Sequence, residues 1–299
     1  MAEGKGDGPG EQQLRPAVPT RALIWIVGAV VLAALIAALV RQAGLLDRYL
    51  IFFPESEVLA TPADYGLAYE DVWLETRDGV RLHGWIVRPA ASPGGSTRVV
   101  LWLHGNSGNI GHRAAAVAAM ARGIGVPVMI IDYRGYGQSE GSPAEEGLYR
   151  DAEAAYDYLA ARPEFSGSSI VAFGRSLGAA VAVELAIRRQ VEALVLESPF
   201  TSVSEMARLT NRFLPSGLLV RARFDTLAKM PEVRAPVLVF HGTDDEIVPV
   251  DMGRRVHEAA PGRKRLYLLE GAMHNDPHHE PGAPYYSVLS DFLEGGSGG

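Results

Sequence analysis

Short apolar segments that alternate with longer helical patterns constrain the fold of this 299-residue chain more than any other feature. Runs such as RVVLWL at 98–103 are continuously apolar, as expected of strands buried on both faces of a parallel sheet. Strands that alternate with helices of about 10–15 residues predict an α/β fold with a mostly parallel, doubly wound sheet over residues 71–294. The predicted strands are 71–76, 80–87, 98–103, 126–131, 169–173, 192–196, 237–240 and 265–269, and the predicted helices are 110–122, 144–161, 177–189, 252–260 and 284–292.

An uncharged apolar run at residues 22–40 precedes this domain and is bracketed by Arg21 and Arg41. As a helix it would be about 28 Å long, close to the ~30 Å hydrocarbon core of a bilayer. Trp25 lies near one end, where an interfacial aromatic is favoured. A cleaved signal peptide would have a shorter apolar region and a small-residue cleavage site, and a buried helix of a soluble domain is the other alternative. We expect a single-pass transmembrane anchor.

The anchor divides the rest of the chain into segments of different character. Residues 1–20 are rich in Gly, Pro and charge and predict a disordered tail, and 295–299 predict a flexible one. Residues 41–70 form a juxtamembrane segment whose stretch LLDRYLIFFP suits either the membrane surface or packing on the domain. Basic residues number three before the anchor and two after it, which favours a cytoplasmic N-terminus and an extracytoplasmic (periplasmic or lumenal) domain.

Composition excludes several classes of function. The chain has no Cys, so it can have no disulfide, thiolate metal site or cysteine nucleophile. Its net charge is −7, with 28 basic and 35 acidic residues and no basic stripe interleaved with aromatics, so we expect no nucleic-acid partner. We expect no cofactor.

A serine lies in the motif G-R-S-L-G at 174–178, between the apolar strand SIVAF and a helical segment. The two glycines permit a sharp strand-to-helix turn that exposes the Ser176 hydroxyl. The backbone N–H of Leu177, at the N-terminus of the helix, would face the place where negative charge develops during attack on a carbonyl. Ser176 is therefore the candidate nucleophile.

An acid and a base follow on two later loops. Asp245 lies after the strand PVLVF, and His274 lies after the strand KRLYLL, so both are at the carboxyl edge of the sheet. A serine hydroxyl needs such a base, oriented by a carboxylate, to become a nucleophile. Asp244 and Glu246 are adjacent alternatives to Asp245 that more often cap or solvate a loop. We expect His241, which ends a strand beside this loop, to be a structural histidine bonded to backbone.

The histidines near the C-terminus raise the alternative of a metal site. His274, His278, His279 and Glu280 could supply ligands, but Pro277 prevents a regular helix that would bring two of the histidines to one face. We therefore expect no metal.

The loop at 103–109, between the strand RVVLWL and the first crossover helix, is made of small residues that can direct a backbone N–H into the site. Asn106 is the first candidate for a second oxyanion donor and Ser107 the reserve. His104 is expected to brace this loop.

A short insert of 35 residues at 201–235 is expected to form a helical cap over the pocket or an apolar groove for an acyl chain. Its apolar residues are Met206, Leu209, Phe213, Leu214, Leu218 and Leu219.

Several of these segments together resemble one known family. The segments are HGNSGN, DYRGYGQSEGSP, GRSLG, ESPFTS, RFDTL, HGTDDEIVP and GAMHND, over about residues 45–293. They resemble the membrane-anchored α/β-hydrolases of the bud-emergence type. The resemblance implies the triad Ser176–Asp245–His274, an oxyanion hole at Asn106 and Leu177, and a type II topology. Ala179 and Met273 stand where that family usually has glycine, and both could narrow the pocket.

The sequence thus predicts a membrane-anchored serine hydrolase that cleaves ester or thioester bonds of acyl or lipid-like substrates through a covalent acyl-enzyme. A serine peptidase or amidase with the same triad is an alternative, and so is a catalytically silent scaffold that binds a membrane partner. Serine rather than aspartate in the elbow argues against epoxide or haloalkane hydrolysis.

Overall fold

The central element of the fold is an eight-stranded sheet with the order β10-β9-β8-β7-β4-β6-β3-β2. A computed structural model describes residues 20–42, 44, 46–89, 98–165, 169–210, 220–275 and 284–295. Within these residues, β3 runs antiparallel to both β2 and β6, and the other neighbouring strands are parallel. The strands are β2 Tyr69–Glu75, β3 Arg81–Val87, β4 Arg98–Leu103, β6 Val128–Ile131, β7 Ser169–Arg175, β8 Ala193–Glu197, β9 Val237–Gly242 and β10 Lys264–Leu269. This is the predicted doubly wound α/β fold.

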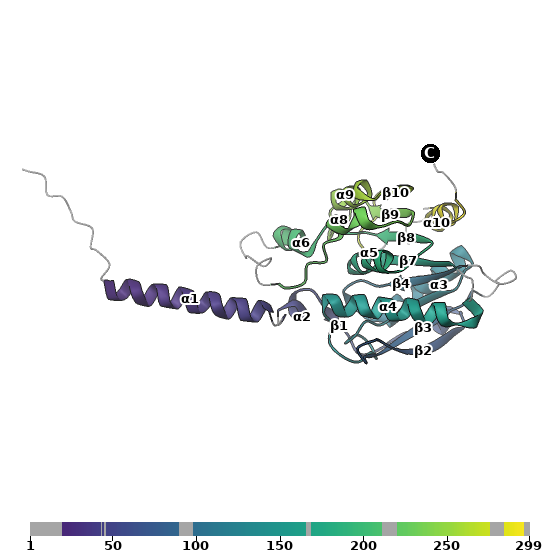
Figure 1. The fold of residues 1–299 in the computed structure, drawn as a ribbon. Helices are drawn as coiled ribbons and strands as arrows, with labels where there is room; N and C mark the ends of the chain where they lie inside the picture. The colour runs from purple at the N-terminus through teal and green to yellow at the C-terminus, as the bar shows by residue number, and fades with distance from the viewer. Residues whose placement is uncertain are drawn as a thin grey trace, which may run out of the picture.

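Helices cover both faces of the sheet (Figure 1). One core lies between the sheet and α4, α5 and α9, and the other between the sheet and α3 and α10. The central strands β4, β7 and β9 are almost entirely apolar because both of their faces are buried. The covering helices are α3 Ala114–Ile124, α4 Glu145–Ala161, α5 Leu177–Arg188, α8 Thr226–Lys229, α9 Val250–Ala259 and α10 Tyr285–Leu293. The first crossover differs from the prediction in beginning as a 3₁₀ turn, η2 Ile110–Arg113.

The helix α1, Thr20–Gln42, extends away from the rest of the described chain (Figure 1). It is long and apolar enough to cross a membrane by length and composition, and Trp25–Gln42 has no buried share. An amphipathic helix of a globular domain would bury one face, whereas α1 is apolar all round. The predicted tails at 1–20 and 295–299 lie outside the described residues except at their inner ends, Thr20, where α1 begins, and Gly295.

The segment after α1 packs on the domain, one of its two predicted locations. It contains α2 Asp47–Leu50 and β1 Phe53–Pro54, and β1 pairs in parallel with β5 Ser107–Gly108. Ile51 and Phe52 are buried. The Asp47 carboxylate accepts hydrogen bonds of 2.8 and 2.9 Å from the N–H groups of Arg221 and Ala222. The base of α1 is thus joined both to the loop before η2 and to the segment 201–235.

The segment 201–235 contains α6 Val203–Thr210, α8 and the 3₁₀ turn η4 Met230–Glu232. The helical character expected of a cap is present in these described parts. Phe213, Leu214, Leu218 and Leu219 lie at 211–219, outside the described residues. Leu209 on α6 is exposed.

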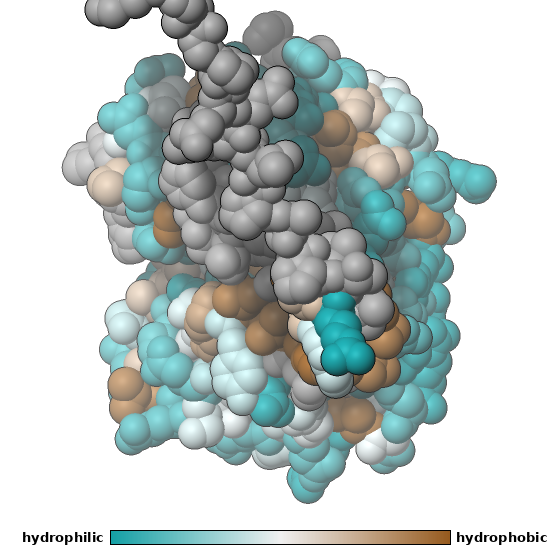
Figure 2. Space-filling view, turned by 90° about the vertical axis from the view of Figure 1, so that its left-hand side faces the viewer, coloured by the Kyte–Doolittle hydropathy of each residue, from teal (hydrophilic) through white to brown (hydrophobic). Residues whose placement is uncertain are grey.

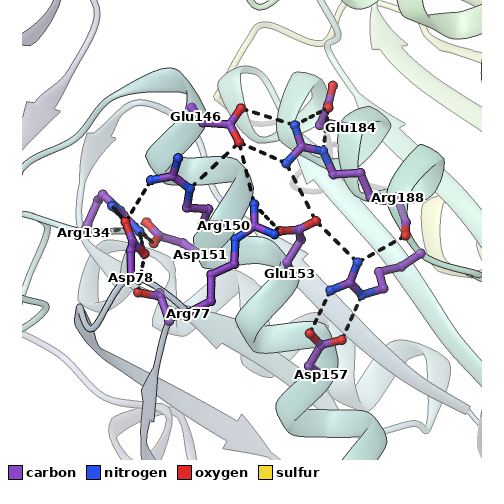
Figure 3. Close-up of polar contacts among 12 residues, drawn as sticks. Arg77, Asp78, Arg134, Glu146, Arg150, Asp151, Glu153, Asp157, Glu184 and Arg188 are labelled. Carbon is purple, nitrogen blue, oxygen red and sulfur yellow. Dashed lines mark hydrogen bonds and ion pairs between the residues drawn. The ribbon is translucent and has the colours of Figure 1, made fainter.

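A network of ion pairs joins the turn between β2 and β3 to α4 and α5 (Figure 3). Its members include Arg77, Asp78, Arg134, Glu146, Arg150, Asp151, Glu153, Asp157, Glu184, Arg188 and Arg189. The Arg134–Asp151 pair at 2.8 Å is buried, so it holds the loop after β6 on α4 more firmly than the exposed pairs, which are worth little individually. A cavity of about 550 Å³ beside this network is lined in part by Arg77, Arg150, Glu153, Asp157 and Arg189.

Candidate active site

Ser176 occupies a sharp turn between β7 and α5. Its backbone has φ 53° and ψ −115°, a left-handed conformation that costs a non-glycine residue roughly 1–3 kcal/mol. The turn is possible because Gly174 and Gly178 have no side chains: a Cβ on Gly178 would lie 1.9 Å from the carbonyl oxygen of Leu103. The Ser176 N–H donates to the carbonyl of Glu197 at 2.9 Å, which fixes the turn on β8. Strain of this kind is typical of a functional residue.

Asp245 and His274 meet beside this turn. His274 Nδ1 lies 2.8 Å from Oδ2 and 3.0 Å from Oδ1 of Asp245, although the two residues are 29 positions apart. Both side chains are buried. Because a carboxylate only accepts, the shared proton is on Nδ1, which leaves Nε2 as the basic nitrogen.

Asp245 is kept ionised. Burial would raise the pKa of its carboxyl, but hydrogen bonds to His241 and His274 outweigh burial and lower the pKa well below its usual range. The N–H groups of Ile247 and Val248 also donate to Oδ1, at 3.0 and 2.7 Å. Asp245 can therefore orient His274 and stabilise its protonated form.

The residues on either side of Asp245 have other contacts. The carboxylate of Glu246 accepts from the backbone N–H of His274 at 3.0 Å, and Asp244 accepts from Thr243 at 3.3 Å. The His241 ring lies 2.9 Å from the Val248 carbonyl, which confirms the prediction of a backbone-bonded histidine. Of the three acids, Asp245 is the one that contacts the imidazole of His274.

Asn106 and Ser107 lie on the loop after β4 and both line the same cavity as Ser176. The Asn106 side chain donates to the Ile51 carbonyl at 2.8 Å. The backbone carbonyl of Asn106 accepts from the N–H of Phe53 at 2.9 Å and from the Tyr136 hydroxyl at 2.8 Å. The side chain and the carbonyl of Asn106 are thus committed to structural bonds, so Asn106 would serve an oxyanion through its backbone N–H.

His104 braces this loop, as predicted. Its Nδ1 lies 2.7 Å from the Gly105 carbonyl, and the Tyr133 hydroxyl donates to the His104 carbonyl at 3.0 Å. The side chain is completely buried, and burial lowers its pKa to about 4. His104 is therefore neutral at physiological pH and keeps its place in the core.

A cavity of about 650 Å³ lies over Ser176, Leu177 and His274. Much of its wall is apolar and comes from the juxtamembrane segment and the segment 201–235: Leu50, Ile51, Phe53, Met206, Ala207 and Val220. Figure 2 views the face from which α1 emerges and shows apolar residues gathered below its centre, with hydrophilic ones toward the edge. Ala179 is buried within α5 and Met273 is 47% exposed, and neither is among the described lining residues, so the structure gives no support to the expectation that they narrow the pocket.

Behind the site is an ion pair that sequence reasoning missed. Arg175 is part of the serine motif, and its Nε lies 3.0 Å from the Glu197 carboxylate. Its Nη2 donates to the His274 carbonyl at 2.6 Å. The Tyr285 hydroxyl donates to the other oxygen of Glu197. Burial, then the adjacent Glu197, raise the pKa of Tyr285 well above its usual value, so this hydroxyl stays protonated. The only signal was that Arg175 and Glu197 fall in the segments GRSLG and ESPFTS; their contacts span 22 and 99 positions.

The described residues do not form the alternative metal site. Within the described part of the chain, no group of three His, Asp or Glu side chains is placed to hold a metal ion. His278, His279 and Glu280 lie at 276–283, outside that part.

Comparison with known proteins agrees with this architecture. A family model described as serine aminopeptidase, S33, matches residues 95–223 and 209–281. The α/β hydrolase domain-containing protein WAV2 of Arabidopsis thaliana is 37% identical over 252 residues, covering 78% of this chain and 81% of its own. Protein bem46 of Schizosaccharomyces pombe is 36% identical over 252 residues, covering 81% and 82%.

Among solved structures, the esterase Pf2001 of Pyrococcus furiosus superposes with a TM-score of 0.67 at 24% identity, covering 82% of this chain and 97% of that one. At this identity the likeness shows the fold alone. With the family model over residues 95–281 and relatives above 30% identity over most of its length, the chain belongs to the α/β-hydrolase family S33 and is a hydrolase.

Proposed function

We propose that the protein is a serine hydrolase that cleaves carboxylic esters or thioesters with an acyl or lipid-like chain. One observation carries the proposal: the strained Ser176 and the Asp245–His274 pair line or adjoin a single cavity in a hydrolase fold. Three groups from three separate loops have no common structural reason to meet there. Nucleophilic catalysis supplies such a reason.

The mechanism follows from the chemistry of these groups. His274 Nε2 takes the proton of Ser176 as the hydroxyl oxygen attacks the carbonyl carbon. The N–H groups of Leu177 and Asn106, with Ser107 the reserve, hold the oxyanion. The tetrahedral intermediate collapses, His274 protonates the leaving alcohol or thiol, and an acyl-Ser176 ester remains. Water then attacks this ester and gives up its proton to His274, which passes it to the Ser176 oxygen as the acyl–oxygen bond breaks and the carboxylic acid leaves.

The apolar wall of the cavity supports an acyl substrate. A pocket of this volume holds a drug-sized ligand or part of a lipid chain. Leu50, Ile51 and Phe53 lie only a few residues after α1, and Arg41 at its end donates to the Val220 carbonyl at 3.3 Å. If α1 spans a bilayer in the type II sense, the extracytoplasmic domain has its acyl pocket beside the membrane surface. Lipids or acylated proteins of that membrane are then the nearest substrates.

The family description suggests a second candidate, an aminopeptidase. Such an enzyme must bind the cationic α-amino group of a peptide, for which a carboxylate in the pocket is the natural partner. The described lining residues include Arg113 and Arg175 and no Asp or Glu. The charge of the pocket therefore favours ester substrates over peptides with a free amino terminus.

Covalent labelling of the full-length protein in detergent micelles tests the proposal. A fluorophosphonate should add one adduct to the wild type by intact mass, and none to Ser176→Ala or to His274→Ala within the same time. Ser202→Ala serves as a matched control, because Ser202 lies near the cavity but outside its described lining, and should label like the wild type. Equal labelling of Ser176→Ala would refute the nucleophile. A folded wild type that neither labels nor hydrolyses esters would favour a silent scaffold, and capture of a membrane partner would follow.

A further inference from the structure

Arg113, the last residue of η2, lines the proposed active-site cavity without a carboxylate partner. Its Nη2 donates to the Ser107 carbonyl at 2.8 Å, and its Nε is buried with no hydrogen-bond partner. Within the described chain, no Asp or Glu lies at ion-pair distance from this guanidinium. Arg175, the other arginine of the lining, is in contrast paired with Glu197.

Arg113 differs in this respect from the two arginines of the described chain that are buried, Arg134 and Arg175, which both pair with a carboxylate. The arginines of the network on α4 and α5 each contact one or more carboxylates (Figure 3). Acidic residues outnumber basic ones by 35 to 28, so carboxylates are not scarce. A buried donor without a partner costs about 1–3 kcal/mol, and more when it is charged. A ligand whose negative charge pairs with the guanidinium would explain why Arg113 lacks a carboxylate partner within the protein.

The electrostatics of the cavity agree with this reading. Burial, and then repulsion by Arg175, lower the pKa of Arg113 to about 10, against an opposing effect of Glu197. The guanidinium is still positively charged at neutral pH. It therefore provides a fixed positive charge in a partly desolvated cavity, where attraction for an anion is stronger than in water.

We propose that Arg113 is an anion-binding subsite and that the substrate is an acyl ester carrying a phosphate or carboxylate near its scissile bond. The inference rests on the proposed ester hydrolysis at Ser176. The apolar wall takes the acyl chain, and the free N–H groups of the guanidinium bind the anionic oxygens as a fork. The phosphate of a membrane glycerolipid and that of a small soluble ester present the same chemistry to Arg113.

Two matched pairs of esters test the subsite on the full-length protein in detergent micelles. The first pair is 1-oleoylglycerol and 1-oleoylglycerol 3-phosphate, and the second is the same pair with butyryl chains. The wild type should have at least a tenfold higher kcat/KM for the phosphate of a pair. Arg113→Gln should lower this ratio at least tenfold, mainly through KM, and Arg113→Lys by less. A preference for the oleoyl phosphate over the butyryl one would identify a lipid as the source.

The alternative is that Arg113 only braces the loop through the Ser107 carbonyl. In that case Arg113→Gln would lower kcat equally for neutral and phosphorylated esters, which would overturn the subsite. Equal hydrolysis of both members of each pair by the wild type would also overturn it. Arg254→Gln is the matched control, because Arg254 is exposed on α9 and is no part of the described lining.

A binding measurement separates failure of the subsite from failure of the proposed hydrolysis. Titration calorimetry of 1-oleoylglycerol 3-phosphate into Ser176→Ala should show binding that Arg113→Gln weakens at least tenfold. Binding with that loss, but no turnover by the wild type, would support the subsite and refute the hydrolase. Turnover of neutral esters with no effect of Arg113 on binding would do the reverse.

Discussion

Replacing Arg175 by Gln tests whether the ion pair behind the site holds His274, the proposed base. Its guanidinium side chain is 7% exposed and the Glu197 carboxylate 1%. Removing one partner of a buried pair costs about 3–5 kcal/mol, because the other charge remains buried. For a domain of this size each kcal/mol lowers Tm by about 2–4 °C, so we expect a fall of about 6–20 °C. Urea unfolding followed by tryptophan fluorescence and circular dichroism measures the free energy.

The double variant Arg175→Gln/Glu197→Gln separates charge from position. It removes the buried carboxylate, so at least half of the lost stability should return. The His274 carbonyl still lacks its donor, so the histidine loop stays loose. We therefore expect kcat for a nitrophenyl ester to remain roughly 10–100-fold below the wild type in both variants.

Two results would refute this reasoning. Losses of stability that simply add in the double variant would mean that Arg175 and Glu197 are not coupled. A folded Arg175→Gln protein with the kcat of the wild type would mean that the contact with the His274 carbonyl does not position the base. Arg98→Gln, which breaks the half-exposed pair with Glu192, is the matched control for loss of an arginine and should leave kcat unchanged.

Four further results are expected. Ser176→Ala should lower kcat by about 10⁴–10⁶-fold with unchanged circular dichroism, and substantial turnover would contradict its role. Gly178→Ala should cost about 3 kcal/mol or more by urea unfolding, because its Cβ would lie 1.9 Å from the backbone of β4, and a neutral effect would refute the close approach. The pKa of His104 falls from 6.5 in the unfolded chain to about 4 in the folded one, so between these pH values the unfolded chain binds more protons. The free energy of unfolding should therefore fall by about 3 kcal/mol as the pH is lowered from 6.5 to 4. His104→Phe should reduce this dependence of stability on pH. Asp47→Ala leaves the N–H of Ala222 without its acceptor and should speed proteolysis of the segment 201–235, whereas Asp64→Ala should not.

Much of the fold could be predicted because its signals are local. Continuous apolar runs such as β4 predict strands buried on both faces, and the alternation with helices predicts a parallel sheet. The two glycines around Ser176 predicted a sharp turn, since only glycine allows the approach of α5 to β4. The prediction of the first crossover helix was less accurate. Asn109 caps a 3₁₀ turn before α3 begins, and no periodicity in the sequence marks the change from 3₁₀ turn to α-helix.

The candidate site depended more on tertiary structure. The sequence alone predicted that Ser176, Asp245 and His274 lie at one edge of the sheet, because the carboxyl ends of parallel strands meet there. It favoured Asp245 over the adjacent Asp244 and Glu246, and in the folded loop Asp245 is the one of the three that contacts the imidazole.

By itself, then, the sequence determined the sheet, the serine turn and the apolar helix, which depend on periodicity and on residues close together in the chain. Only the tertiary structure decided that Arg175 holds the His274 carbonyl, that the segment at 51–53 supports the loop of Asn106, and that Arg113 lies in the cavity without a carboxylate. The physical reason is that a hydrogen bond or a missing counter-charge is defined by the position of atoms within about 3–4 Å, and residues far apart in the chain reach that distance only when the core has packed.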